Sequence, residues 1–180
     1  MNVILISGKA RAGKTSTANI LKSLLEKNGK RVLIANYGGL VKYVSEKFWG
    51  WNGEKEGCGR TILQNVGDIV RNKDIDYWVN FVKDFIVASK DKWDYALIDD
   101  VRFLNEINRW RNIDGIDYIT VRVERLGFDS PLTREQQNHI SETSLDNYRF
   151  DYKIIAENMM QLEDEVFWFY EILKGGDEDK

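Results

Sequence analysis

The sequence predicts an α/β fold in which helices cover a mostly parallel β-sheet. Short β-rich runs alternate along the chain with longer runs of helical periodicity, and 180 residues without an internal repeat suit one domain. The five expected strands span residues 3–7, 31–36, 95–99, 118–124 and 152–156. The expected helices span residues 14–27, 40–49, 60–72, 76–90, 103–111 and 159–173.

Composition limits the classes of function. With 43% hydrophobic and 31% charged residues, the chain suits a globular domain that folds without staples. Its 26 basic and 29 acidic residues give a net charge of −3, which offers no overall field for a polyanion, so a phosphorylated substrate would need a local basic pocket. The single cysteine, Cys58, and the absence of a charged leader before residues 3–6 favour the cytoplasm. We therefore expect neither a nucleic acid nor a membrane as partner.

The segment after the first expected strand, GKARAGKT at residues 8–15, matches the pattern G-x-x-x-x-G-K-[ST] and precedes a helix. Gly8 and Gly13 let the backbone curl so that N–H groups point inward, and the helix N-terminus adds positive charge. Lys14 would reach the β- and γ-phosphates of a nucleoside triphosphate, and the Thr15 hydroxyl would bind Mg²⁺. A glycine turn that matches by chance is disfavoured because strand, helix and position all agree. The N-K-x-D pattern of guanine switches is incomplete at residues 72–75.

The connection between the second and third strands is unusually long and includes the glycine-rich, charged residues 49–59, so we expect a small lobe there. In the helix that follows, Arg60, Gln64, Gly67 and Arg71 fall on one stripe, and apolar residues fill the opposite side. This polar stripe suits a phosphate and a base edge, but a solvated face is an equal alternative. Trp78, in the next helix, could face an acceptor base, although tryptophans usually pack in cores.

Carboxylates follow the third expected strand, at the edge where open α/β sheets bind ligands. Asp99 or Asp100 could hold a magnesium-bound water or a substrate hydroxyl. Of these residues, Asp99 is taken as the candidate for Mg²⁺, and Asp100 and Glu106 as candidates for binding an acceptor. Arg102 could neutralise a phosphate. Capping of the next helix is the competing role for the two aspartates, and an ion pair with Asp100 is the competing role for Arg102.

The fourth strand ends with Arg122 and Arg125, and residues 125–141, which contain Arg134 and Pro131, have the composition of a mobile flap. Arginines on a closing segment stabilise a transferring phosphoryl group and exclude water, although surface solubility explains any one of them alone. His139 is expected to have a structural or lid-positioning role. Residues 175–180 are expected to form a frayed acidic tail.

Six segments carry a family resemblance in chain order: GKARAGKT, GRTILQNVGDIVR followed by DYWVN, DDVRFLNE, VRVER, HISETSL and FDYKIIAEN. With these segments the chain resembles the deoxynucleoside monophosphate kinases of the bacteriophage type, within the adenylate-kinase-like P-loop group. The resemblance implies a three-layer sandwich with a five-stranded parallel sheet, an acceptor-binding lobe at about residues 37–91 and a short lid at about residues 125–141. It also implies Mg²⁺-dependent transfer of the ATP γ-phosphoryl group to a deoxynucleoside monophosphate, which yields ADP and a deoxynucleoside diphosphate.

The resemblance and the residue patterns together give three sets of candidate site residues. ATP would contact Gly8, Arg11, Ala12, Gly13, Lys14, Thr15, Ser16 and, at the adenine, Asn158, with Thr15 and Asp99 at the metal. The acceptor would contact Lys9, Asn36, Tyr37, Arg60, Gln64, Arg71, Trp78, Asp100 and Glu106. The candidate catalytic residues are Lys14, Arg102, Arg122, Arg125 and Arg134.

Two other functions stay open at this stage. A P-loop kinase of a non-nucleotide phosphate ester, such as phosphomevalonate, would share the DVR and HxSE patterns. A regulatory ATPase that is not a kinase would share only the phosphate-binding loop. No residue is expected to act as a covalent nucleophile, and the sequence leaves the preferred base, the sugar and a homodimer undecided.

Overall fold

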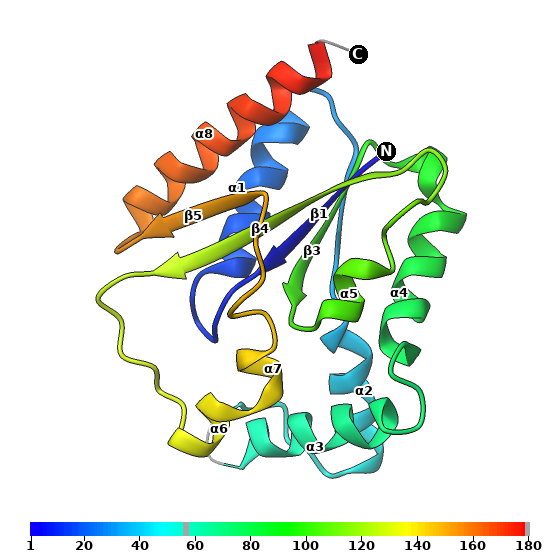
Figure 1. Cartoon of the computed structure of the whole chain (residues 1–180), viewed down its shortest axis with the longest axis vertical. Helices are drawn as coiled ribbons and strands as arrows, with labels where there is room; N and C mark the ends of the chain where they lie inside the picture. The colour runs from blue at the N-terminus through cyan, green and yellow to red at the C-terminus, as the bar shows by residue number, and fades with distance from the viewer. Residues whose placement is uncertain (56–57, 179–180) are drawn as a thin grey trace.

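The computed structural model describes residues 1–55 and 58–178, and it is built on a parallel sheet with strand order β2-β3-β1-β4-β5 (Figure 1). The strands are β1 (Asn2–Ser7), β2 (Val32–Ala35), β3 (Tyr95–Val101), β4 (Asp117–Arg125) and β5 (Tyr152–Ala156). Neighbouring strands pair in parallel, as the alternation of strands and helices predicts. The α/β class and the five predicted strands are confirmed, each strand within two residues of its expected ends.

Helices cover both faces of the sheet. They are α1 (Lys14–Lys27), α2 (Gly38–Phe48), α3 (Gly59–Arg71), α4 (Tyr77–Ala88), α5 (Leu104–Asn108), α6 (Arg134–Asn138), α7 (Ile140–Thr143) and α8 (Met159–Glu178), with a short 3₁₀ turn at Lys90–Lys92. Ile4 and Ile6 of β1 pack with α1 and α8, whereas Val3 and Leu5 pack with α4 and α5. Because β1 is buried on both faces, it has the continuous apolar sequence typical of a central parallel strand.

Two expectations about helices need correction. Helix α5 ends at Asn108 and not near residue 111, because the chain turns through Asn112, whose φ of 59° is left-handed. Helix α8 continues to Glu178, so residues 175–178 are helical and not a frayed tail; residues 179–180 lie outside the described part of the chain.

The expected flap at residues 125–141 contains two short helical segments that were not predicted. These are α6 and the first two residues of α7. The start of α6 has a visible sequence signal, because Thr133 and Gln136 form a reciprocal capping box with distances of 3.2 and 3.3 Å. His139 caps α7 by accepting a hydrogen bond from the backbone N–H of Ser141.

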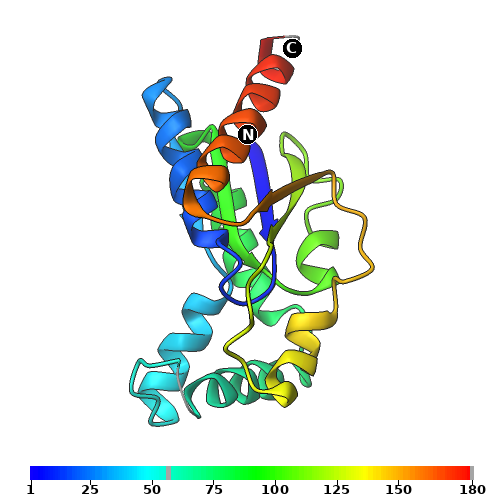
Figure 2. The ribbon, with the colours of Figure 1, turned by 90° about the vertical axis from the view of Figure 1, so that its left-hand side faces the viewer.

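The lobe and the lid gather at the carboxyl ends of the strands. Figures 1 and 2 show α2 and α3 beyond this edge of the sheet, with α6 and α7 beside α3. The Gln136 side chain donates to the Thr61 hydroxyl over 3.3 Å, so α6 contacts the start of α3 directly. Residues 56–57 of the expected loop at 49–59 lie outside the described part of the chain.

None of the helices in the described residues is long and apolar enough to cross a membrane.

A small core holds the lobe together. Trp78 of α4 is 2% exposed and packs with Val41 of α2 and Val66 of α3. Its indole N–H donates to the Gly67 carbonyl over 3.2 Å. The structure therefore places Trp78 in the core of the lobe and not at a ligand, which corrects the expectation that it faces an acceptor base.

Replacing this indole tests the correction. We expect Trp78→Ala to lower the free energy of unfolding by about 3–5 kcal/mol, because the deletion leaves a cavity in the core of the lobe. Trp49→Ala is the matched control, since Trp49 is half-exposed, and it should change the same quantity by less than about 0.5 kcal/mol. Urea unfolding measures both. Equal effects of the two substitutions would contradict the placement of Trp78.

Candidate active site

A cleft of about 1110 Å³ opens at the carboxyl ends of β1, β2 and β3. Its walls come from the phosphate-binding loop, α2, α3, the turn after β3 and the lid. Among the residues that the structure describes, eight basic side chains line it: Arg11, Lys14, Lys42, Lys55, Arg60, Arg71, Arg102 and Arg125. Five carboxylates accompany them: Asp99, Asp100, Glu106, Glu142 and Glu157. A chain with a net charge of −3 thus has a positively charged cleft, which suits a phosphorylated ligand.

The phosphate-binding loop joins the end of β1 at Ser7 to the start of α1 at Lys14. A Cβ atom on Gly8 would lie 2.5 Å from the Val123 carbonyl oxygen, so the close passage of the loop beside β4 requires glycine. Gly13 has a left-handed φ of 105° and precedes α1 without a side-chain cap. The first N–H groups of α1 therefore stay available to an anion, as the sequence motif predicts.

Lys14 is buried at the base of this loop. Its ammonium donates to the carbonyl oxygens of Gly8 and Lys9 over 2.9 and 2.8 Å. Burial first and the charge of Arg102 second lower the pKa of Lys14 to about 7. A phosphate bound in the loop would place a negative charge beside the Lys14 ammonium. It would therefore stabilise the charged form and raise the pKa of Lys14.

The pairing of β1 with β3 brings two candidate metal ligands together. The Thr15 hydroxyl donates to Asp99 over 2.7 Å. Asp99 lies two residues before the end of β3 and is almost fully buried. Both are hard oxygen ligands, which fit Mg²⁺. No three His, Cys, Asp or Glu side chains in residues 1–55 and 58–178 gather to hold a metal alone, so Mg²⁺ here would also need phosphate oxygens and water.

Asp100 has a different task from Asp99. Its carboxylate accepts hydrogen bonds from the N–H groups of Tyr37 and Gly38, over 2.8 and 2.7 Å. Asp100 therefore fixes the start of α2, and not the helix that follows it in sequence. Burial raises its pKa, while these two hydrogen bonds lower it. Tyr37 is buried, and its hydroxyl is held by Trp110 and by the Glu106 carbonyl, so the hydroxyl belongs to the core.

The polar stripe of α3 faces the cleft. Arg60, Gln64 and Arg71 all line it, whereas Gly67 is covered by the Arg71 guanidinium, which would lie 2.6 Å from an added Cβ. Arg71 stacks 4.2 Å above the Phe103 ring and pairs with Asp68 over 3.3 Å, and burial lowers its pKa. The Gln64 Nε2 and Arg60 Nε atoms are buried without a hydrogen-bond partner. Such unsatisfied donors are uncommon in folded proteins and are expected beside a ligand.

Glu106 holds the turn after β3. One carboxylate oxygen accepts hydrogen bonds from the N–H groups of Arg102 and Phe103, over 2.5 and 3.0 Å. Burial is the main cause that raises the pKa of Glu106 to about 7, and the hydrogen bond from the Arg102 N–H opposes it. Glu106 thus orients Arg102 through the backbone while it lines the cleft.

Four more predicted residues line the cleft near the loop or the lobe. They are Arg11 and Ser16 around the loop, Asn36 at the lobe and Asn158 at the start of α8. The Asn158 side-chain oxygen accepts from the Gln161 N–H, so this residue also caps α8. Arg125 lines the cleft as well and lies 4.5 Å from the Phe128 ring centre.

Five predicted residues do not line the cleft: Gly8, which shapes the loop from beneath it, Trp78, which lies in the core of the lobe, and Lys9, Arg122 and Arg134. Lys9 and Arg122 both pair with Asp146, over 2.6 and 3.3 Å, and the Arg122 guanidinium also lies 5.6 Å from the Phe150 ring. Asp146 follows α7 and is distant in sequence, so its role as their counter-charge could not be seen in the motif itself. Arg134 is exposed at the first position of α6 and does not line the cleft.

Comparison with known proteins gives one relative and a set of distant folds. No protein-family model matches the chain. Uncharacterized protein ORF77 of Ictalurid herpesvirus 1 (strain Auburn) is 30% identical over 170 residues, which cover 92% of this chain and 69% of that protein. The chain belongs to the family of this herpesvirus protein.

Several solved kinase structures align with the chain at low similarity. The APS kinase of Mycobacterium tuberculosis is 11% identical with a TM-score of 0.49, and the alignment covers 96% of both chains. The shikimate kinase of Bacteroides thetaiotaomicron is 14% identical with a TM-score of 0.48, and the alignment covers 96% of this chain and 98% of the other. At these values neither alignment assigns an activity to the family.

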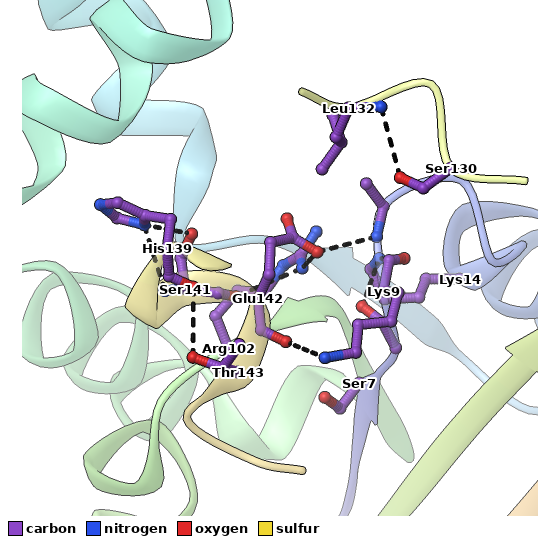
Figure 3. Close-up of polar contacts among 12 residues, drawn as sticks. Ser7, Lys9, Lys14, Arg102, Ser130, Leu132, His139, Ser141, Glu142 and Thr143 are labelled. Carbon is purple, nitrogen blue, oxygen red and sulfur yellow. Dashed lines mark hydrogen bonds and ion pairs between the residues drawn. The ribbon is translucent and has the colours of Figure 1, made fainter. Parts of the chain in front are cut away.

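Glu142 and its neighbours were not predicted as site residues. The Glu142 carboxylate pairs with Arg102 over 2.8 Å (Figure 3). It also pairs with Arg60 over 3.3 Å. His139 bridges the lid to α3, because one ring nitrogen lies 2.9 Å from Asp68 and the other 2.9 Å from the Ser141 hydroxyl. This geometry agrees with a lid-positioning role for His139. The sequence signal that could have pointed to these contacts is the segment HISETSL at residues 139–145, which contains all three side chains.

The pKa of Glu106 predicts how stability depends on pH. A carboxyl with a native pKa of about 7 and an unfolded value of 4.5 contributes stability below pH 4.5, and this contribution is lost as the pH rises through 7. Glu106→Gln keeps an oxygen for the Arg102 and Phe103 N–H groups but cannot ionise. We therefore expect the difference between the Tm of the variant and that of the wild type to be at least about 3 °C more favourable to the variant at pH 8 than at pH 5.

Thermal unfolding at both pH values checks this expectation. Glu163→Gln on the exposed side of α8 is the matched control, and its Tm should follow the wild type at both values. A Glu106→Gln difference that does not change with pH would show that the wild-type carboxyl is not held in a destabilising environment.

Proposed function

We propose that the protein transfers the γ-phosphoryl group of ATP to a deoxynucleoside monophosphate. One observation carries the proposal: a single cleft is lined both by the phosphate-binding loop and by the arginines of α3 and of the β3–α5 turn. We assign Lys14 and the Thr15–Asp99 pair to the donor side, and Arg60, Arg71 and Arg102 to the second, acceptor side. An enzyme that moves a phosphoryl group between two phosphorylated substrates needs positive charge for both.

The cleft is large enough to accommodate more than one small ligand. Its volume of about 1110 Å³ is at the upper end of the roughly 300–1,000 Å³ that small-molecule sites occupy. Phosphoryl transfer requires the donor and acceptor oxygens in line, and most of its catalysis comes from positioning and electrostatics. A cleft that holds both substrates at once meets that requirement.

The residues of the loop would act as follows. Mg²⁺ held near Thr15 and Asp99 would neutralise charge on the β- and γ-phosphates. Lys14 would exchange the carbonyl oxygens of Gly8 and Lys9 for phosphate oxygens. Arg102 would bring its charge to the transferring group, and Pro131, Leu132 and Thr133 of the lid, which line the cleft, would exclude water.

The second side of the cleft suits a flat base as well as a phosphate. Val41, Leu63 and Phe103 supply apolar surface, and the unpaired Gln64 amide nitrogen supplies a donor for a carbonyl or ring nitrogen. These features favour a nucleotide over a small aliphatic phosphate ester. The preference for a deoxy sugar rests on the sequence resemblance alone.

Coupled ADP release tests the proposal. The protein is assayed with Mg²⁺-ATP and, in turn, each common ribo- and deoxyribonucleoside monophosphate and phosphomevalonate. We expect many-fold stimulation by one or more deoxynucleoside monophosphates. Stimulation by phosphomevalonate alone would identify a kinase of another phosphate ester, and no stimulation by any compound would reject phosphoryl transfer to this class of acceptor.

Gln64 allows a sharper prediction about the acceptor. Gln64→Ala removes the donor without changing the charge of the cleft, so we expect the KM for the acceptor to rise about three- to tenfold while the KM for ATP stays constant. Asn65→Ala is the matched control, because Asn65 is the exposed neighbour on the same helix. A change in the KM for ATP, or equal effects of the two substitutions, would contradict the assignment of α3 to the acceptor.

A further inference from the structure

Glu142 connects three parts of the cleft that are far apart in sequence. It belongs to α7, directly after the lid, and only 2% of its side-chain surface is exposed. One carboxylate oxygen lies 2.8 Å from Arg102 and 3.0 Å from the Ala10 N–H, and the other lies 3.3 Å from Arg60. The same carboxylate thus contacts the β3–α5 turn, the phosphate-binding loop and α3.

The two arginines need a shared counter-charge. Burial is the main cause that lowers the pKa of Arg60; the charge of Glu142 raises this pKa, and the charge of Arg102 lowers it further. Without the carboxylate, the two guanidinium groups would repel each other and separate. Both are about one-fifth exposed and line the cleft, so a ligand in the cleft can reach them. Two arginines and one carboxylate also leave a net positive charge for a phosphate.

The backbone around Glu142 is fixed as well. Lys9 donates to the Glu142 carbonyl, and Arg102 donates to the Ser141 carbonyl over 3.3 Å (Figure 3). These contacts anchor α7 to the loop and to the turn after β3. An incoming phosphate that displaced the carboxylate would have to disrupt this anchoring, which argues against Glu142 as an internal competitor for the anion site.

We propose that Glu142 is a positioning residue that holds Arg60 and Arg102 side by side against the phosphate-binding loop. The proposal rests on the proposed phosphoryl transfer, in which both arginines must face the group in transit. The lid continues directly into α7, which carries Glu142. A movement of the lid would therefore also move the carboxylate that holds the two arginines.

Glu142→Asp is the most direct test, because it keeps the charge and withdraws the carboxylate by one methylene. We expect kcat with the best acceptor to fall at least about tenfold, since a misplacement of about 1 Å can cost about 10²-fold. The KM for ATP should stay within about twofold of the wild type. Glu171→Asp on the exposed side of α8 is the matched control and should leave kcat unchanged.

A double-mutant cycle with Arg102→Lys separates positioning from a general structural effect. In the Arg102→Lys background the forked guanidinium is absent, so Glu142→Asp should cost less than about threefold in kcat. Equal losses in both backgrounds would overturn the proposal, as would a kcat for Glu142→Asp within twofold of the wild type.

Two further arms cover the remaining outcomes. If Glu142→Asp does not fold, Glu142→Gln replaces it: a fall in kcat supports positioning, whereas tighter acceptor binding shows a competitor and overturns the proposal. If no monophosphate stimulates the wild type, the proposed function has failed, and binding of inorganic sulfate, followed by thermal unfolding, decides on Glu142. Sulfate should bind at least about threefold more weakly to Glu142→Asp than to Glu171→Asp; equal affinities would overturn the proposal.

Discussion

The parallel pairing of β1 with both β3 and β4 is the constraint on which the site depends. It places the carboxyl ends of three strands at one edge, where the phosphate-binding loop, Asp99 and the turn bearing Arg102 emerge together. The buried apolar residues of β1 fix this register from both faces of the sheet. If β1 were displaced along its neighbours, Thr15 and Asp99 would separate and the two sides of the cleft would lose their alignment.

The carboxylates of the cleft mainly organise other groups. Asp100 fixes the start of α2, Glu106 fixes the turn that carries Arg102, and Glu142 joins two arginines to the loop. Each is satisfied by N–H groups or by a guanidinium, as buried charges require. The basic residues outnumber them among the described cleft residues, so the acids can order the site without cancelling its attraction for phosphate.

Residue spacing within one segment predicted those parts of the site that a single loop or helix forms. The strand–loop–helix motif at residues 8–15 and the polar stripe of α3 depend on spacing, and both lie where they were expected. Lys9 and Arg122 were misplaced because Asp146, which neutralises them, is more than 20 residues from either. Trp78 was misjudged because its partners in α2 and α3 are known only from packing, and Glu142 was missed because its three contacts are all long-range.

The proposed phosphoryl transfer requires that donor and acceptor occupy one cleft at the same time. Calorimetric titration of each deoxynucleoside monophosphate into the protein saturated with Mg²⁺ and a non-hydrolysable ATP analogue tests it most directly. We expect that at least one of them still binds with one molecule per chain. If the saturated protein binds none of them, the cleft holds a single nucleotide and the proposed transfer between two bound substrates is wrong.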